Sequence, residues 1–74
     1  MAPTQLDCRN LNCPMPIVRL SRALKKLDTG SQIEIQATDP AFQADLEAWT
    51  ERMGHRLDEF HAGTVQRALV TKGG

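Results

Sequence analysis

The apolar residues of this chain recur at two spacings, one typical of strands and the other typical of helices. Residues 4–8 carry apolar side chains at alternate positions, which predicts a short strand with one buried face. Residues 32–38 alternate more regularly, because three polar side chains separate the apolar ones, and they predict a second half-buried strand. Both segments are expected in a sheet that is covered on one side.

Two further strands are expected in the C-terminal part of the chain, over residues 56–61 and 65–72. Residues 62–64, with the sequence Ala-Gly-Thr, lie between them and are expected to form the turn of a hairpin. Leu57 and Phe60 are out of step with simple alternation, which predicts a β-bulge or an irregular register in the first of these strands.

Helical spacing marks the two segments between the strands. Residues 14–27 predict a helix that begins at Pro14, because proline at the first helical position loses no hydrogen bond. Residues 40–53 predict a second helix, with Asp39 as its N-cap and Gly54 as its stop signal. Each helix carries one apolar stripe, formed by Ile17, Leu20, Leu24 and Leu27 in the first and by Phe42, Leu46, Trp49 and Met53 in the second.

The order of these elements is β-α-β-α-β-β, which predicts an α/β fold. Two helices packed on one face of a four-stranded mixed sheet would cover the apolar stripes, so a two-layer α/β sandwich is the expected architecture. At 74 residues the chain is long enough for one modest core, and residues 1–74 are expected to form a single domain.

Composition and charge narrow the classes of function. Apolar residues make up 41% and charged residues 24%, as in ordinary globular proteins, and nine basic residues balance nine acidic ones. A net charge of zero argues against strong nonspecific attraction to nucleic acids or membranes. The sequence shows neither an apolar run of membrane-spanning length nor a secretory signal, so we expect a cytoplasmic monomer with free thiols.

Cys13 is the residue whose position points most directly to chemistry. It precedes Pro14 and Pro16, so its thiol is expected at the N-cap of the first helix, where partial positive charge favours an anion. A thiolate is such an anion, so the pKa of Cys13 is expected to fall, with the Met15 amide as the local donor to sulfur. The residue types alone leave open a buried, unreactive cysteine beside prolines that merely start a helix.

The segment from Leu6 to Pro16, with the sequence LDCRNLNCPMP, resembles the signature of the TusA-like (SirA-like) sulfur-carrier family, Leu-Asp-x-Arg-Gly-Leu-x-Cys-Pro-x-Pro. The Asp39-Pro40 and Gly54-His55 pairs also match the family pattern, so the resemblance spans nearly the whole chain. It implies a two-layer α/β sandwich in which Cys13 accepts sulfane sulfur as a persulfide and passes it on. Apart from that covalent sulfur, the resemblance implies no cofactor, and no metal is expected.

The resemblance also implies partner proteins. Family members take sulfur from a donor such as a cysteine desulfurase or a rhodanese-type protein. They deliver it to a downstream sulfur-acceptor protein in tRNA thiolation, molybdenum-cofactor enzymes or sulfur oxidation. The chain would thus be a sulfurtransferase-type carrier rather than a turnover enzyme, and direct binding of nucleic acid is not expected.

Three residues depart from the family pattern. Asn10 replaces the usual glycine, which is a mild change because asparagine also tolerates positive φ. Met15 stands where many tRNA-thiolation carriers have glutamate, which weakens the link to that pathway. Cys8 stands where a small residue such as alanine is common, and it is either a small core residue or a resolving thiol that attacks a Cys13 persulfide.

Basic residues gather on the first predicted helix, while acidic residues gather on the second. The candidate docking residues on the first helix are Met15, Val18, Arg19, Arg22 and Lys26, with Lys25 beside them. Together they form either a solvated face or a docking surface, in which apolar side chains rimmed by arginines would receive an acidic partner beside Cys13.

Other functions remain open on the sequence alone. Cys8 and Cys13 could form a thiol–disulfide redox pair, or the basic helix could belong to a protein- or RNA-binding module without chemistry. The Gly73-Gly74 pair resembles the diglycine of ubiquitin-like carriers, which hold sulfur as a thiocarboxylate, although two helices do not fit their β-grasp fold. A frayed polar tail is the simpler interpretation of that pair. His55 and His61 lack zinc spacing and are expected to be structural or solvent-facing.

Overall fold

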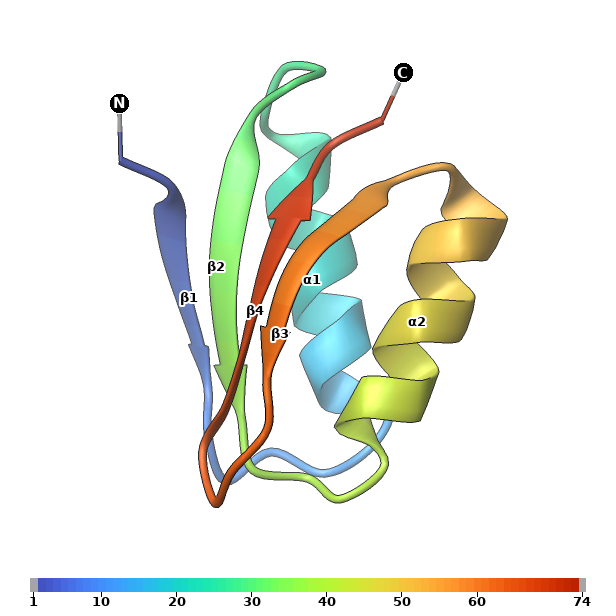
Figure 1. Cartoon of the computed structure of the whole chain (residues 1–74). Helices are drawn as coiled ribbons and strands as arrows, with labels where there is room; N and C mark the ends of the chain where they lie inside the picture. Colours follow the sequence, from blue (N-terminus) through green and yellow to red (C-terminus); the bar gives the residue numbers. More distant parts are fainter. Residues whose placement is uncertain (1, 74) are drawn as a thin grey trace.

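The computed structural model describes residues 2–73, which form two helices and four strands in the order β-α-β-α-β-β (Figure 1). The elements are β1 (Thr4–Cys8), α1 (Met15–Lys25), β2 (Gln32–Ala37), α2 (Phe42–Met53), β3 (Arg56–His61) and β4 (Gln66–Thr71). All six segments predicted from the hydrophobic pattern are present, and each strand boundary lies within one residue of the predicted one.

The four strands form one mixed sheet in the order β1-β2-β4-β3. β1 is parallel to β2, and β4 is antiparallel to both of its neighbours, β2 and β3. β4 therefore lies between two parallel strands that α2 connects. Both helices cover the same face of the sheet (Figure 1), which confirms the predicted two-layer α/β sandwich. Within residues 2–73, no helix is both long and apolar enough to cross a membrane.

Two irregular backbone positions agree with the sequence prediction. The register between β3 and β4 shifts between Leu57 and Glu59, which confirms the expected bulge. Asn10 has a φ of 66°, and its N–H donates to the hydroxyl oxygen of Thr38 at 2.9 Å. This bond ties the connection after β1 to the end of β2 and so helps to place the residues that follow.

The core lies between the helices and the sheet. Its buried residues are Cys8, Leu20, Leu24, Ile33, Ile35, Ala37, Phe42, Leu46, Trp49, Ala68 and Val70. Met53 was expected in the buried stripe of α2 but exposes 52% of its surface, because α2 ends there and the chain turns away at Gly54. Leu27 packs against the core from outside α1, which ends at Lys25.

α1 begins one residue later than predicted, at Met15, and its N-cap is Pro14 rather than Cys13. The Met15 N–H donates to the carbonyl oxygen of Asn12 at 2.8 Å, which closes a turn before the helix. Cys13 lies inside this turn, and its peptide bond to Pro14 is cis. The predicted N-cap position of the thiol is wrong by one residue, because the turn places Cys13 just outside the helix.

α2 also begins later than predicted, at Phe42, and its N-cap is Ala41. A turn precedes the helix, closed by the Phe42 N–H, which donates to the carbonyl oxygen of Asp39 at 3.0 Å. Because no side chain caps α2, the predicted capping role of Asp39 is wrong. The predicted stop at Gly54 is confirmed, since that residue has a left-handed φ of 76°.

The C-terminal segment is docked as far as Gly73. Its N–H donates to Nδ1 of His55 at 3.0 Å, and the His55 ring packs against Trp49 with a centroid distance of 5.0 Å. Gly73 lies so close to Gly54 that a Cβ atom would overlap the Gly54 carbonyl oxygen. The predicted frayed tail is therefore wrong for Gly73, while Gly74 lies outside the described residues.

Candidate functional site

Of the two cysteines in the described part of the chain, Cys13 has an exposed side chain and Cys8 is buried. It lies in the connection from β1 to α1, at the end of the sheet where the connection from β2 to α2 also lies (Figure 1). Because β1 and β2 are parallel, the connections that follow them leave the same end of the sheet. Side chains from the start of α2 can therefore meet the thiol, although they are distant from it in the sequence.

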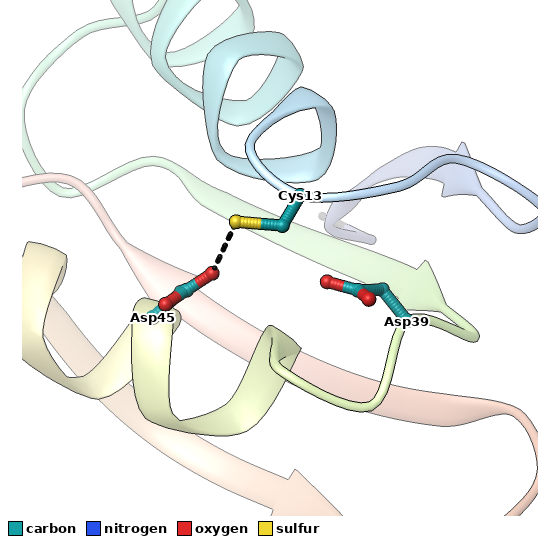
Figure 2. A group of neighbouring side chains, drawn as sticks. All are labelled: Cys13, Asp39 and Asp45. Atoms are coloured by element: carbon teal, nitrogen blue, oxygen red, sulfur yellow. Dashed lines mark hydrogen bonds between the residues drawn. The ribbon is translucent and has the colours of Figure 1, made fainter.

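Two carboxylates lie beside the Cys13 sulfur (Figure 2). The Cys13 thiol donates a hydrogen bond to Oδ2 of Asp45, with a sulfur–oxygen distance of 2.9 Å. The Asp39 carboxylate completes the group, in which the sulfur and one oxygen of each carboxylate lie within 4.8 Å of one another. Oδ2 of Asp39 is buried and has no hydrogen-bond partner among the described residues.

These carboxylates reverse the predicted direction of the Cys13 pKa shift. The hydrogen bond to Asp45 raises the pKa of Cys13 most, and desolvation and the negative charges of Asp45 and Asp39 act in the same direction. The start of α1 offers little compensation, because the Met15 N–H is bonded elsewhere and Pro16 has no N–H. The prediction of a lowered pKa is therefore wrong, and so is the role of Met15 as the donor to sulfur.

Two adjoining grooves extend from Cys13 between α1 and α2, and we call them together the interhelix groove. The first has a volume of about 310 Å³ and is lined by Cys13, Pro14, Ile17, Asp45, Ala48, Trp49 and Arg52. The second has a volume of about 320 Å³, shares three of these residues and adds Val18, Ser21, Arg22 and Lys25. The Cys13 thiol thus lies at one end of a partly apolar groove, and the basic side chains of Arg22 and Lys25 line the part of the groove that does not contact Cys13.

Cys8 has a different environment from Cys13. It is completely buried at the end of β1, where it is paired with Ala37 of β2. Burial is the main cause that raises the pKa of the Cys8 thiol, and both cysteines are free thiols. This placement supports the interpretation of Cys8 as a small core residue, while its role as a resolving thiol stays a prediction.

The candidate docking residues of α1 point in more than one direction. Met15, Arg19, Arg22 and Lys26 are exposed and Val18 is half-buried. Of these five, Val18 and Arg22 line the interhelix groove. Arg19 lies near β1 instead. The pKa of Asp7 on that strand is lowered to about 2, mainly by the hydrogen bonds from Arg9 and to a smaller extent by the charge of Arg19. Their function as a docking surface stays a prediction.

The two histidines have the structural and solvent-facing positions that were predicted. His55 packs against Trp49, and His61 is exposed, with Nε2 at 3.3 Å from a carboxylate oxygen of Glu59. Cys13, Asp39 and Asp45 are compact enough to approach one ion, but exposed acidic groups often gather without one, so we assign no metal to them. What this cluster does is accept a hydrogen bond from the Cys13 thiol and place negative charge beside its sulfur, and both raise the pKa of that thiol.

The chain belongs to the TusA sulfurtransferase family, whose model, Sulfurtransferase TusA, matches residues 4–72. YrkI of Bacillus subtilis (strain 168) is 39% identical over 69 residues, which cover 92% of each chain. YrkF of the same organism is 44% identical over 70 residues, and this chain spans only 38% of its length. The sulfur carrier protein TusA of Allochromatium vinosum is 36% identical over 55 residues, which cover 74% of this chain and 72% of that protein.

The fold also matches a solved structure. A SirA-like protein from Desulfitobacterium hafniense superposes with a TM-score of 0.81, over 96% of this chain and 99% of that one, at 22% sequence identity. At this identity the likeness supports the fold alone. The family and the two-layer fold that the sequence resemblance implied are both confirmed.

Sequence reasoning missed Asp39 and Asp45 as neighbours of Cys13. A signal was present in the excess of acidic residues on α2 and in the strand-helix-strand order of β1, α1 and β2, which is the order that joins parallel strands. Parallel neighbouring strands place the starts of both following helices at one end of the sheet. An acid in the first turn of α2 is therefore a candidate neighbour for a cysteine before α1.

Proposed function

We propose that this chain is a sulfur carrier that binds sulfane sulfur as a persulfide on Cys13 and relays it to a downstream acceptor protein. The observation that carries this proposal is the exposed Cys13 thiol at the mouth of the interhelix groove, in a chain of the TusA family. Because Cys8 is buried in the core, Cys13 is the thiol that a partner protein can reach.

Loading exchanges one sulfur–sulfur bond for another. The Cys13 thiolate attacks the outer sulfur of a donor persulfide, the sulfur–sulfur bond of the donor breaks, and a new one forms on Cys13. The donor leaves as a thiolate and takes up the proton that Cys13 released, so there is no net oxidation. In delivery, an acceptor thiolate attacks the outer sulfur of the Cys13 persulfide, a sulfur–sulfur bond forms on the acceptor and the one on Cys13 breaks. Cys13 leaves as a thiolate and takes up the proton that the acceptor thiol released.

A donor suited to this site presents sulfur as a persulfide on a cysteine of its own, as a cysteine desulfurase or a rhodanese-type protein does. Pro14 and Pro16 have fixed φ angles, so they restrict the backbone conformations that are open to Cys13 and limit the positions that its thiol can take. The basic face of α1 around Arg22 would receive an acidic surface of the partner. We place the carrier in the cytoplasm, because exposed thiols stay reduced there.

Intact-mass measurement after incubation with a cysteine desulfurase and free cysteine tests the proposal. The wild-type chain should gain the mass of one sulfur atom, and a reductant should remove it. Cys13→Ser should abolish the gain, whereas Cys8→Ala should retain it.

The same measurement separates the alternatives. Absence of a gain in the wild type, or a gain that survives Cys13→Ser, would contradict the proposal. Loss of two hydrogen atoms that requires both Cys8 and Cys13 would indicate a thiol–disulfide redox protein. A thiocarboxylate at the C-terminus would exchange oxygen for sulfur and give about half the mass gain, because an oxygen atom has half the mass of a sulfur atom.

A further inference from the structure

Asp45 directs its side chain at Cys13 rather than at its own helix. It lies in the first turn of α2, where a carboxylate often serves the helix N-terminus, yet α2 has no side-chain capping bond. Oδ2 of Asp45 instead accepts the Cys13 Sγ–H at 2.9 Å, across 32 positions of sequence. Figure 2 shows the sulfur turned toward this carboxylate. The contact therefore joins the thiol to the second helix.

Negative charge dominates the surroundings of the Cys13 sulfur. Asp45 faces the sulfur from α2 and Asp39 faces it from the connection before α2, and neither forms an ion pair within residues 2–73. The other charged side chains of the interhelix groove are Arg52 on α2 and Arg22 and Lys25 on α1. The hydrogen bond to Asp45, followed by desolvation and the two negative charges, raises the pKa of Cys13, and no cation is among its causes.

We propose that Asp45 is a positioning residue for sulfur transfer, which keeps the Cys13 sulfur protonated and turned toward α2 while the carrier is free. This inference rests on the proposed function of Cys13 as the carrier residue. Asp45 forms no covalent bond to sulfur in the transfer, and the Cys13 proton is still taken up by the departing thiolate of the donor. A thiol is a weaker nucleophile than a thiolate, so the free carrier resists oxidants and unspecific exchange.

Activation follows from the same geometry. A partner that brings a positively charged side chain to Asp45 would compete for Oδ2 and compensate the negative charge beside the sulfur. The thiolate would then form in the complex, where the outer sulfur of the donor is within reach. Asp45 would in this way restrict rapid transfer to partners with a cation beside their own reactive sulfur.

The alkylation rate of Cys13 as a function of pH tests the role of Asp45. The experiment uses iodoacetamide and the full chain in a Cys8→Ala background, with EDTA present to exclude bound metal ions. Asp45→Asn keeps the size of the side chain and removes its charge. Its profile should shift to lower pH, with several-fold faster alkylation at neutral pH. At high pH, where Cys13 is ionised in both proteins, the rates should converge or the variant should be slower, because nucleophilicity falls with basicity.

Two further variants make the test specific. Glu47→Gln removes the same charge from an exposed position on α2 and should leave the profile in place. Asp39→Asn removes a neighbouring charge without removing the hydrogen bond, so its shift should have the same direction and be smaller. A profile of Asp45→Asn that superimposes on that of its parent, or an equal shift for Glu47→Gln, would overturn the proposal. Asp45→Ser keeps the test valid if Asp45→Asn does not fold, because it also removes the carboxylate beside the sulfur, and an unshifted profile there would also overturn the proposal.

The mass-based loading assay distinguishes a failure of this inference from a failure of the proposed function. Asp45→Asn retains Cys13, so it should still gain one sulfur atom from the desulfurase. A wild type that loads sulfur while the Asp45→Asn profile stays in place would refute the role of Asp45 alone. A wild type that gains no sulfur would refute the carrier function, whatever the alkylation profile shows.

Discussion

At the scale of single residues, the Cys13 sulfur experiences opposing influences from a helix end and from two acids. A helix N-terminus carries about half an elementary charge, whereas each ionised carboxylate carries a full one. The N-terminus of α1 also offers the sulfur few hydrogen-bond donors, because Pro16 lacks an N–H and the Met15 N–H donates to the Asn12 carbonyl oxygen. The carboxylates prevail, so a cysteine beside a helix start is not a low-pKa thiol by position alone.

Cys8 allows a prediction that separates packing from chemistry. Its thiol is completely buried among apolar side chains, so Cys8→Ser should lower the free energy of unfolding by about 1–3 kcal/mol, because it buries a hydroxyl group. Cys8→Ala removes one heavy atom and should cost about 1 kcal/mol. Urea denaturation measures both values, and sulfur loading should persist in both variants. A folded Cys8→Ser protein that loads sulfur but cannot release it would instead support a resolving thiol.

At the scale of the elements, the two helices supply different parts of the site. α1 contributes the thiol just before its start and the basic side chains along its length, while α2 contributes the acid that bonds the thiol. Trp49 of α2 and Ile17 of α1 line both parts of the interhelix groove. An approaching partner would therefore meet an apolar floor, basic residues along α1 and carboxylates beside the sulfur.

Charge reversal on α1 tests whether this groove receives partners. Arg22→Glu should slow sulfur transfer from the desulfurase several-fold, and added salt should reduce the difference from wild type, because rim charges act mainly on association. Alkylation of Cys13 by a small reagent should stay nearly unchanged. The transfer rates at several ionic strengths are measured by quenching the reaction at successive times and determining the sulfur-loaded fraction from the intact mass.

A matched control for Arg22 lies on the other side of the molecule. Arg67 of β4 is exposed between the buried Gln66 and Ala68, so its side chain points away from the helices. Arg67→Glu makes the same change of charge there and should leave transfer unaffected. Equal slowing by both variants would show that net charge matters and that the α1 surface has no special role.

The elements themselves could be predicted, but their contacts could not. Alternating burial in β2 and the bulge between Leu57 and Glu59 follow from which side chains must leave water, and the sequence displays that directly. The helix starts were misplaced, because backbone bonds in the preceding turns decide them. The Cys13–Asp45 bond depends on how α1 packs beside α2, and neither apolar stripe reports that geometry.

At the scale of the whole molecule, the connection from β1 to α1, which carries Cys13, and the end of β4, which leads to Gly73, lie at opposite ends of the sheet (Figure 1). The C-terminal end is fastened by backbone bonds, since the Gly30 N–H donates to the Lys72 carbonyl oxygen at 2.9 Å and the Lys72 N–H donates to the Ser31 carbonyl oxygen at 2.8 Å. Gly73 is bonded to His55 in turn. The docking of Gly73 does not fit a diglycine carrier, whose tail must extend into a partner enzyme. It also makes His55 a link between Gly73 and α2.

His55 should give the stability of the whole molecule a dependence on pH. Burial, followed by the charge of Lys72, lowers the pKa of His55 in the folded chain below its ordinary value of about 6.5. As the pH falls below about 6.5, the unfolded chain gains a proton that the folded chain does not, so the free energy of unfolding decreases. The contribution is present in full above that pH and is lost as the pH falls through the lowered folded pKa. Protonation also removes the Nδ1 lone pair that accepts the Gly73 N–H.

Urea denaturation between pH 5 and pH 8 measures this contribution, with His55→Asn as the informative variant. The asparagine carbonyl can replace Nδ1 as an acceptor but does not titrate, so the dependence on pH should flatten. Its stability should fall at every pH, because the ring contact with Trp49 is lost. His61→Asn is the matched control and should keep the wild-type dependence, since the His61 ring is exposed to water. If His61→Asn flattened the curve and His55→Asn did not, the link between the C-terminus and α2 would not be the source of the pH dependence.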